Sequence, residues 1–420
     1  MHQTHRHLTT MLRVGALLLA GGASTNDVET TMLTLAQAAG LAAMQTTVIS
    51  GLISVSWDSG PPREPMTMIR VVRQRLTEYD RLAAVASVVN RLVDGDLAFD
   101  EVDAWLDALE GRVRNYSSRE TLLATSASAA ASTVLFGGGI AEAAAAAIAV
   151  GVAQPLVDRL GATGFPTFFQ NVIAPAIVTL VAVVLIGLRL PINGPIAVTG
   201  AILLFLPGSA LVASMRDLID GENVSGTARL AEALLLGAAV ALGIAAALSM
   251  GTVIGVQVIL LNLNPPEPRT VIQVLAAMLA VGFFAVRAGA PRNSVLIAAL
   301  LGGLGVATRE FATGIQTQAV FATAIAATAI GTVARLAARR FRSLSTIWVG
   351  AASLPLLPGL LILRGLTAPT PLDGVTLLAE ALATGFAIGI GVGVGDVLVS
   401  TLMRVHSNLV QPAIRRRMRT

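Results

Sequence analysis

Two glutamates inside apolar segments of this chain occupy matching positions in a repeated pattern. Glu232 and Glu380 each stand third in the tetrapeptide Leu-Ala-Glu-Ala. A carboxylate within a bilayer is costly, so residues of this kind usually serve a function. Because desolvation favours the protonated form of a carboxyl group, the pair is a candidate for proton binding and release. The alternative is that both lie near helix starts, where a carboxylate interacts favourably with the helix dipole.

Three further polar residues in apolar surroundings are candidates for transport chemistry. Asp396, in Gly-Val-Gly-Val-Gly-Asp, could relay protons or simply extend its carboxylate to the interface. Gln170 and Asn171 could bind the carboxylate and ammonium groups of an amino acid, since a zwitterion needs both a donor and an acceptor. Hydrogen bonding between helices is the alternative explanation for these two amides.

A Pro-Gly pair interrupts two long apolar segments at corresponding places, first at Pro207 and Gly208 and again at Pro358 and Gly359. Proline removes a backbone donor and bends a helix, which frees polar backbone to face an interior cavity. Interrupted helices at matching positions of two repeats generally mark the substrate site of a secondary transporter. These four residues are therefore predicted to contribute to substrate binding.

The composition predicts a polytopic α-helical membrane protein. Of 420 residues, 54% are hydrophobic and only 13% charged, and the mean hydropathy is +0.74. Soluble domains contain about 25% charged residues. The absence of cysteine excludes disulfides and thiolate metal sites. Arginines flank apolar spans instead of alternating with aromatic residues, so membrane-flanking charge is favoured over nucleic-acid binding.

Because a span needs about 20 apolar residues, ten transmembrane helices can be placed. They are predicted at about 121–138, 140–157, 168–188, 192–212, 229–250, 270–288, 293–308, 317–337, 344–363 and 374–399. The stretch 251–263 either lengthens the fifth helix or lies at the interface. Five helices per repeat make the second repeat inverted relative to the first, which is typical of transporters.

The distribution of arginines predicts that both termini are cytoplasmic. Most arginines near span ends fall on the side of the N-terminus, and the other side receives only Arg189, Arg269, Arg309 and Arg364. The predicted organisation is a cytoplasmic α/β domain (1–115), a first membrane repeat (116–263), a second membrane repeat (264–403) and a basic cytoplasmic tail (404–420). Residues 1–26 could also be read as a secretory signal, which this orientation disfavours.

The N-terminal domain is predicted to be small and mixed α/β. Helices are expected at about 8–20, 25–39, 78–93 and 99–109, with Ser24 capping the second. Strands are expected within 44–57, interrupted at Gly51, and at about 66–72. His2, His5 and His7 are expected in a frayed terminus, and no nucleophile–base constellation is evident.

The run Leu12 to Met32, which contains Gly-Gly-Ala-Ser-Thr followed by Glu29, resembles the threonine/serine exporter family. The resemblance extends through the strand pair, the Asp94-Gly95-Asp96 segment and the two Pro-Gly segments. That family joins a hydrophilic N-terminal domain to ten membrane helices in two five-helix units. The resemblance implies export of L-threonine and L-serine across the cytoplasmic membrane, driven by the proton gradient. No cofactor and no metal are expected.

Two other function classes stay open at this point. One is a membrane-anchored enzyme with a hydrolase-like N-terminal domain, which lacks support from any catalytic motif. The other is a passive channel for small solutes. No ATP-binding motif is present, and a homo-oligomer is compatible with the sequence.

Overall fold

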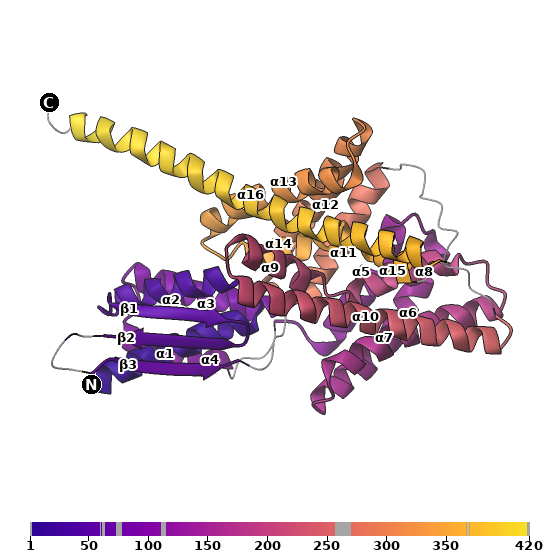
Figure 1. Cartoon of the computed structure of the whole chain (residues 1–420), viewed down its shortest axis with the longest axis horizontal. Coiled ribbons are helices and arrows are strands. Elements are labelled where there is room, and N and C mark those ends of the chain that lie inside the picture. The colour runs from indigo at the N-terminus through magenta and orange to yellow at the C-terminus, as the bar shows by residue number, and fades with distance from the viewer. Residues whose placement is uncertain are drawn as a thin grey trace.

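The computed structural model describes residues 2–58, 60, 64–72, 78–110, 115–256, 270–366, 368 and 370–417, with the backbone alone at residues 2, 110, 363 and 366 and beyond residue 402. The N-terminal elements form one end of the molecule (Figure 1). They are α1 (His2–Ala20), α2 (Thr25–Ala38), β1 (Met44–Ile49), β2 (Leu52–Trp57), β3 (Met66–Val71), α3 (Tyr79–Val93), the 3-10 turn η1 (Phe99–Glu101) and α4 (Val102–Glu110).

The three strands form an antiparallel sheet in the order β1-β2-β3. Gly51 adopts φ +91° at the β1–β2 turn, a conformation that glycine accepts without steric cost. Val48 pairs with Ile53, and both are fully buried on the face of the sheet that α1 and α2 cover. Helices α3 and α4 pack against α1 in turn. The predicted boundaries of strands and helices in this region are confirmed to within a few residues, except that α1 begins at His2.

The remaining helices follow in two series. The first comprises α5 (Ser118–Leu135), α6 (Ile140–Ala162), α7 (Thr167–Gly187), α8 (Gly194–Ile202), η2 (Leu203–Phe205), α9 (Gly208–Ile219) and α10 (Asn223–Val253). The second comprises α11 (Thr270–Arg287), α12 (Arg292–Gly314), α13 (Ala319–Phe341), α14 (Thr346–Ala352), η3 (Leu354–Leu356), α15 (Gly359–Leu366) and α16 (Pro371–Arg417).

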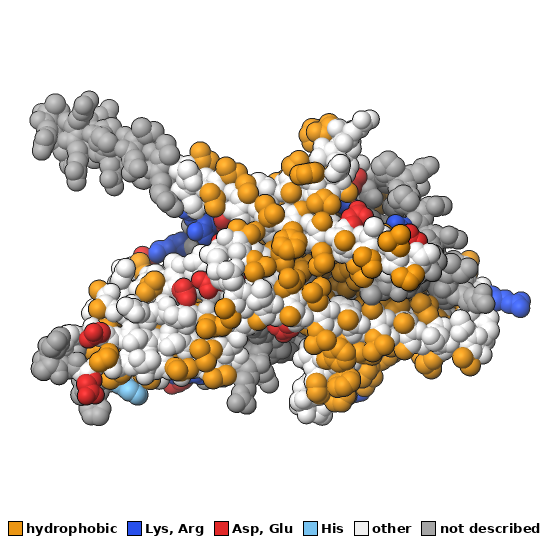
Figure 2. Space-filling model, in the orientation of Figure 1, with side chains coloured by type: hydrophobic (Ala, Val, Ile, Leu, Met, Phe, Trp, Pro, Cys, Tyr) orange, Lys and Arg blue, Asp and Glu red, His pale blue; other side chains and the backbone are white. Residues whose placement is uncertain are grey.

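Seven of the described helices are long and apolar enough to cross a membrane, and the bent pair α8–α9 would make an eighth. Their outward faces carry exposed large apolar side chains, such as Leu235 and Leu242 on α10 (each 56% exposed). Figure 2 shows these hydrophobic side chains spread over the helical part. Neither α5, which is rich in serine and threonine, nor the α14–α15 pair is among the eight. The count of ten spans therefore stays a prediction.

Corresponding helices of the two series have corresponding neighbours. Helix α7 packs on α10 as α13 packs on α16, and α5 packs on α8 as α11 packs on α14. Helices α5 and α11 contact each other and run antiparallel. The Tyr116 hydroxyl, just before α5, donates to the carbonyl of Ala290, just after α11 (3.0 Å), and the Ser128 hydroxyl donates to the carbonyl of Ala280 (2.8 Å). Beyond these, Leu135 packs on Ala276.

Glycines allow close contact between α13 and α16. A Cβ atom added at Gly331 would lie 2.7 Å from the carbonyl oxygen of Val392, and one at Gly395 would lie 2.5 Å from the amide nitrogen of Thr332. An added Cβ at Gly391 would likewise meet α13, whereas added Cβ atoms at Gly385 and Gly389 would meet Leu211 and Met215 of α9. An added Cβ at Gly393 would meet nothing within 4 Å.

Two helices of the structure run past boundaries that were expected from the sequence. Helix α10 extends to Val253, so the start of the 251–263 stretch lengthens the fifth helix, and residues 257–263 lie outside the described residues. Helix α16 continues to Arg417 without a break, so the backbone marks no boundary between residues 403 and 404.

Candidate functional site

The two Pro-Gly segments adopt the same local backbone. In each, a short helix ends in a 3-10 turn, and an extended leucine then precedes the proline (Leu206 ψ 138°, Leu357 ψ 138°). Gly208 N–H donates to the carbonyl of Leu206 and Gly359 N–H to that of Leu357, both at 2.8 Å. The first break bends the α8–α9 pair by 53°. Because proline cannot donate a hydrogen bond, each break leaves a carbonyl of the preceding turn without its helical donor.

The two breaks meet inside the molecule. The side chain of Leu357 lies against Gly208, and that of Leu206 lies against Gly359, where an added Cβ would be 2.5 Å from the Leu206 methyl group. Gly208, Gly359 and Pro358 are buried, and Pro207 is half-buried. Each break therefore packs its leucine on the glycine of the other. The N-termini of α9 and α15, which carry partial positive charge, begin at this junction.

The two amides at the start of α7 are bonded locally. Gln170 Nε2 donates to the carbonyl of Phe165 (2.6 Å), and Asn171 Nδ2 donates to the carbonyl of Thr167 (3.0 Å). Both residues are half-buried beside the α6–α7 turn. The hydrogen bonds that the structure shows for them thus stay within this turn instead of joining two helices.

The structure places Glu232 and Glu380 on exposed faces of α10 and α16. The neighbours Leu234 and Leu235 of Glu232 are at least half exposed. Protein atoms therefore do not enclose either carboxylate, and any desolvation of these groups would come from lipid.

Asp396 forms an ion pair that the sequence did not indicate. Its Oδ2 atom lies 2.7 Å from Nη2 of Arg216 in α9, and their side chains are only 18% and 12% exposed. The pair joins the second series of helices to the first, beyond the Pro-Gly junction. Arg216 follows the apolar run of α9, and an arginine in such a position generally has a partner that compensates its charge.

A second buried ion pair lies next to it and reaches the N-terminal elements. Arg229 Nη1 is 3.1 Å from Asp217 Oδ2, and Asp217 is completely buried. The carboxylate of Asp217 also accepts from the backbone N–H of Thr25 (3.2 Å) and from its hydroxyl (3.3 Å). Arg229 Nη2 donates to the carbonyl of Ala23 (3.2 Å).

The first turn of α2 is built to make these contacts. Gly22 adopts φ +93° between α1 and α2, and the Ser24 hydroxyl caps α2 by accepting from the N–H of Asp27 (3.1 Å), as predicted. Asp27 then accepts from the Thr346 hydroxyl of α14 (3.1 Å). Asn26 donates to Asp220 after α9, and burial raises the pKa of Asp220, although Arg216 and this hydrogen bond oppose the shift.

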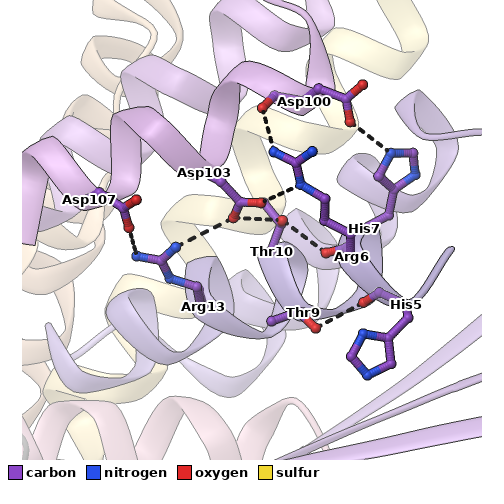
Figure 3. A network of polar contacts seen from close by, with 9 residues as sticks. All are labelled: His5, Arg6, His7, Thr9, Thr10, Arg13, Asp100, Asp103 and Asp107. Atoms are coloured by element: carbon purple, nitrogen blue, oxygen red, sulfur yellow. Dashed lines mark hydrogen bonds and ion pairs between the residues drawn. The ribbon is translucent and has the colours of Figure 1, made fainter. Parts of the chain in front are cut away.

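Of the N-terminal histidines, His7 has a side chain that the structure places in a network of structural contacts. His7 is buried against Phe99, with its Nε2 atom 3.5 Å from Asp100 Oδ1 (Figure 3). Arg13 binds Asp107 (2.6 Å) in the same network, which fastens α4 onto α1. The expectation of a frayed terminus was wrong for His7, because α1 buries this residue beneath η1.

The comparisons with known proteins give one consistent family. Residues 9–251 and 255–399 match the ThrE family model, described as "Putative threonine/serine exporter". A Mycobacterium tuberculosis protein named "Probable threonine/serine exporter" is 32% identical over 414 residues, covering 95% of this chain and 77% of that protein. The "Threonine/serine exporter" of Corynebacterium glutamicum is 30% identical over 402 residues, covering 93% of this chain and 82% of that protein. No solved structure matches the chain. The matched residues include both Pro-Gly segments and the first turn of α2. This multi-pass membrane protein therefore belongs to the threonine/serine exporter family.

Proposed function

We propose that this protein exports L-threonine and L-serine across the cytoplasmic membrane, driven by the proton gradient. The observation that carries the proposal is the family match over nearly the whole chain, together with two relatives named for this activity. The names of these relatives supply the substrates, and the geometry of the helices supports the proposed mode of transport.

The proposed machinery consists of two inverted five-helix repeats, residues 116–263 and 264–403, beside a cytoplasmic domain of residues 1–115 and a basic tail of residues 404–420. The antiparallel packing of α5 and α11 supports the inversion, since these helices open the two repeats. The matching backbone conformation and hydrogen bonding at the two Pro-Gly breaks support the proposal that the two series are copies of one unit. Inverted repeats that pivot about a shared interior give alternating access to a central site.

The substrate is proposed to bind where the two breaks meet. Interrupted helices present helix N-termini to anionic substrate groups and free carbonyls to cations. Pro207, Gly208, Pro358 and Gly359 provide both kinds of group for a zwitterion. Gln170 and Asn171 are proposed to contact the substrate only if their local hydrogen bonds are exchanged during transport.

Protons are proposed to be carried by Glu232, Glu380 or Asp396. Asp396 has the best support, because its ion pair with Arg216 connects the two series of helices. Protonation of Asp396 would remove its negative charge and so release this connection. We also propose that both termini lie on the cytoplasmic side, because cytoplasmic turns retain positive charge and Arg342, in the arginine-rich turn after α13, binds Asp94 of the N-terminal elements.

The test is efflux from cells that lack other threonine exporters and are loaded with a threonine-containing dipeptide. Cells producing the protein are expected to release threonine and serine faster than cells without it. An uncoupler added at a fixed substrate gradient is expected to abolish the difference. Equal release from both kinds of cell would refute the substrate assignment, and release that persists with the uncoupler would indicate a passive channel.

A further inference from the structure

The N-terminal elements contact both series of helices at one end of the bundle. On the first series, Thr25 contacts Asp217 of α9 and Asn26 contacts Asp220. On the second series, Tyr79 N–H donates to the carbonyl of Ala288 after α11 (2.9 Å), and Asp94 binds Arg342 after α13 (2.8 Å). The N-terminal elements therefore bridge the joint between the two series.

The two contacts differ in chemistry. At the contact with the second series, Tyr79 is only 2% exposed, and its hydroxyl lies against Gly350 of α14. Separating this contact would expose a large aromatic side chain to water. The contact with the first series is polar, and polar groups that separate can exchange their partners for water at small net cost.

The polar contact can also open without leaving a charge unpaired. Asp217 and Arg229 both belong to the first series, on α9 and α10, and neutralise each other there. If the first turn of α2 withdraws, it gives up the bonds from Thr25 to Asp217, from Arg229 to the Ala23 carbonyl and from Asn26 to Asp220. The ion pair stays intact, so the costly state of a lone buried charge is avoided.

We infer that the first turn of α2, residues 23–27, is a latch that closes the pathway at the end of the bundle that carries the N-terminal elements. The N-terminal elements stay with the second series, and the latch separates from α9 and α10 each time the pathway opens at this end. The inference rests on the proposed transport by two moving halves, and it gives the N-terminal elements a part in the transport cycle.

The natural absence of cysteine makes a disulfide test direct. Asn26→Cys with Asp220→Cys would lock the latch to the first series, because these two side chains are hydrogen-bonded. Asp27→Cys with Thr346→Cys is the matched control, since it joins the adjacent latch residue to the second series, where the two side chains are 3.1 Å apart. Each full-length variant is assayed for threonine transport in inside-out vesicles, oxidised and after reduction.

Oxidised Asn26→Cys/Asp220→Cys is expected to lose transport and to regain it on reduction, whereas the oxidised control is expected to transport like its reduced form. Undiminished transport by the oxidised first pair would overturn the inference, and so would a block by the control disulfide. Absence of transport by the unmodified protein would count against the proposed function instead.

A distance measurement covers the case in which a cysteine pair is inactive even when reduced. Spin labels at Thr30→Cys on α2 and Thr227→Cys on α10, both exposed, report the separation directly. A second, longer distance is expected when threonine and a proton gradient are supplied. A single unchanged distance under those conditions would contradict the latch.

Discussion

At the scale of residues, the most informative feature is the pair of buried ion pairs next to the first turn of α2. Asp217 is fully buried and Arg229 nearly so, and each has its charge compensated by the other. A buried pair is costly to break and often neutral to replace as a whole. The Asp217–Arg229 pair is therefore interpreted as positioning the first turn of α2, since apolar residues in its place would stabilise the fold equally well.

Removal of one partner is expected to be far worse than removal of both. Asp217→Leu should lower the unfolding free energy by about 3–5 kcal/mol, because it leaves Arg229 buried without its counter-charge. The double variant Asp217→Leu/Arg229→Met should recover most of that loss. Thermal unfolding in detergent measures both, and equal destabilisation by the single and double variants would contradict the pairing.

The pH dependence of the N-terminal elements is expected to involve Glu29. Burial raises the pKa of Glu29, although its carboxylate accepts from the N–H of Val48 (2.8 Å), and nearby Glu222 adds to the rise. Because the folded-state pKa exceeds the unfolded value, the favourable contribution is complete below about pH 4.5, the unfolded value, and is lost as pH rises through the folded-state pKa.

Glu29→Gln retains an acceptor for Val48 and removes the charge. This variant is expected to raise the melting temperature at pH 7 and to change it little at pH 4. The exposed Glu64→Gln is the control and should follow the unmodified protein throughout. A gain for Glu29→Gln that is independent of pH would exclude the carboxylate as its cause.

At the scale of elements, the reciprocal packing of the two breaks is the feature that the geometry supports best. Gly208→Ala would place a methyl group on Leu357, and Gly359→Ala would place one on Leu206. Each is expected to lower the unfolding free energy by about 1–3 kcal/mol through overpacking.

The expected rescue is specific to the opposite break. Leu357→Ala should restore the stability lost in Gly208→Ala but not that lost in Gly359→Ala. Leu206→Ala should restore the stability lost in Gly359→Ala but not that lost in Gly208→Ala. Melting temperatures of the four double variants in detergent test this pattern. Rescue by either leucine without distinction would mean that the breaks are not in direct contact.

Much of the element pattern could be predicted because it depends on local chemistry. Pro-Gly pairs, the Ser24 cap and the interruption of the strands at Gly51 act through nearby backbone, so their positions follow from the sequence. The pairing of Arg216 with Asp396, or of Thr25 with Asp217, depends on helices far apart in the chain. A single sequence contains no signal for which distant charges meet.

At the scale of the whole molecule, the proposed orientation has direct consequences for accessibility. Leu190 in the α7–α8 turn and Gln316 in the α12–α13 turn lie at the end of the bundle opposite the N-terminal elements. Thr163, in the α6–α7 turn, lies at the same end as the N-terminal elements. In intact cells, a membrane-impermeant maleimide is expected to label Leu190→Cys and Gln316→Cys but not Thr163→Cys. Labelling of all three or of Thr163→Cys alone would refute the ten-span arrangement.

The most direct measurement uses the purified protein in proteoliposomes. With an imposed proton gradient, labelled threonine and serine should cross the membrane faster than in protein-free liposomes, and Asp396→Asn should reduce this rate. Unlabelled threonine is expected to compete, whereas a bulky amino acid such as tryptophan is not. If purified, folded protein moves neither threonine nor serine under any gradient, the chain is not an exporter of these amino acids.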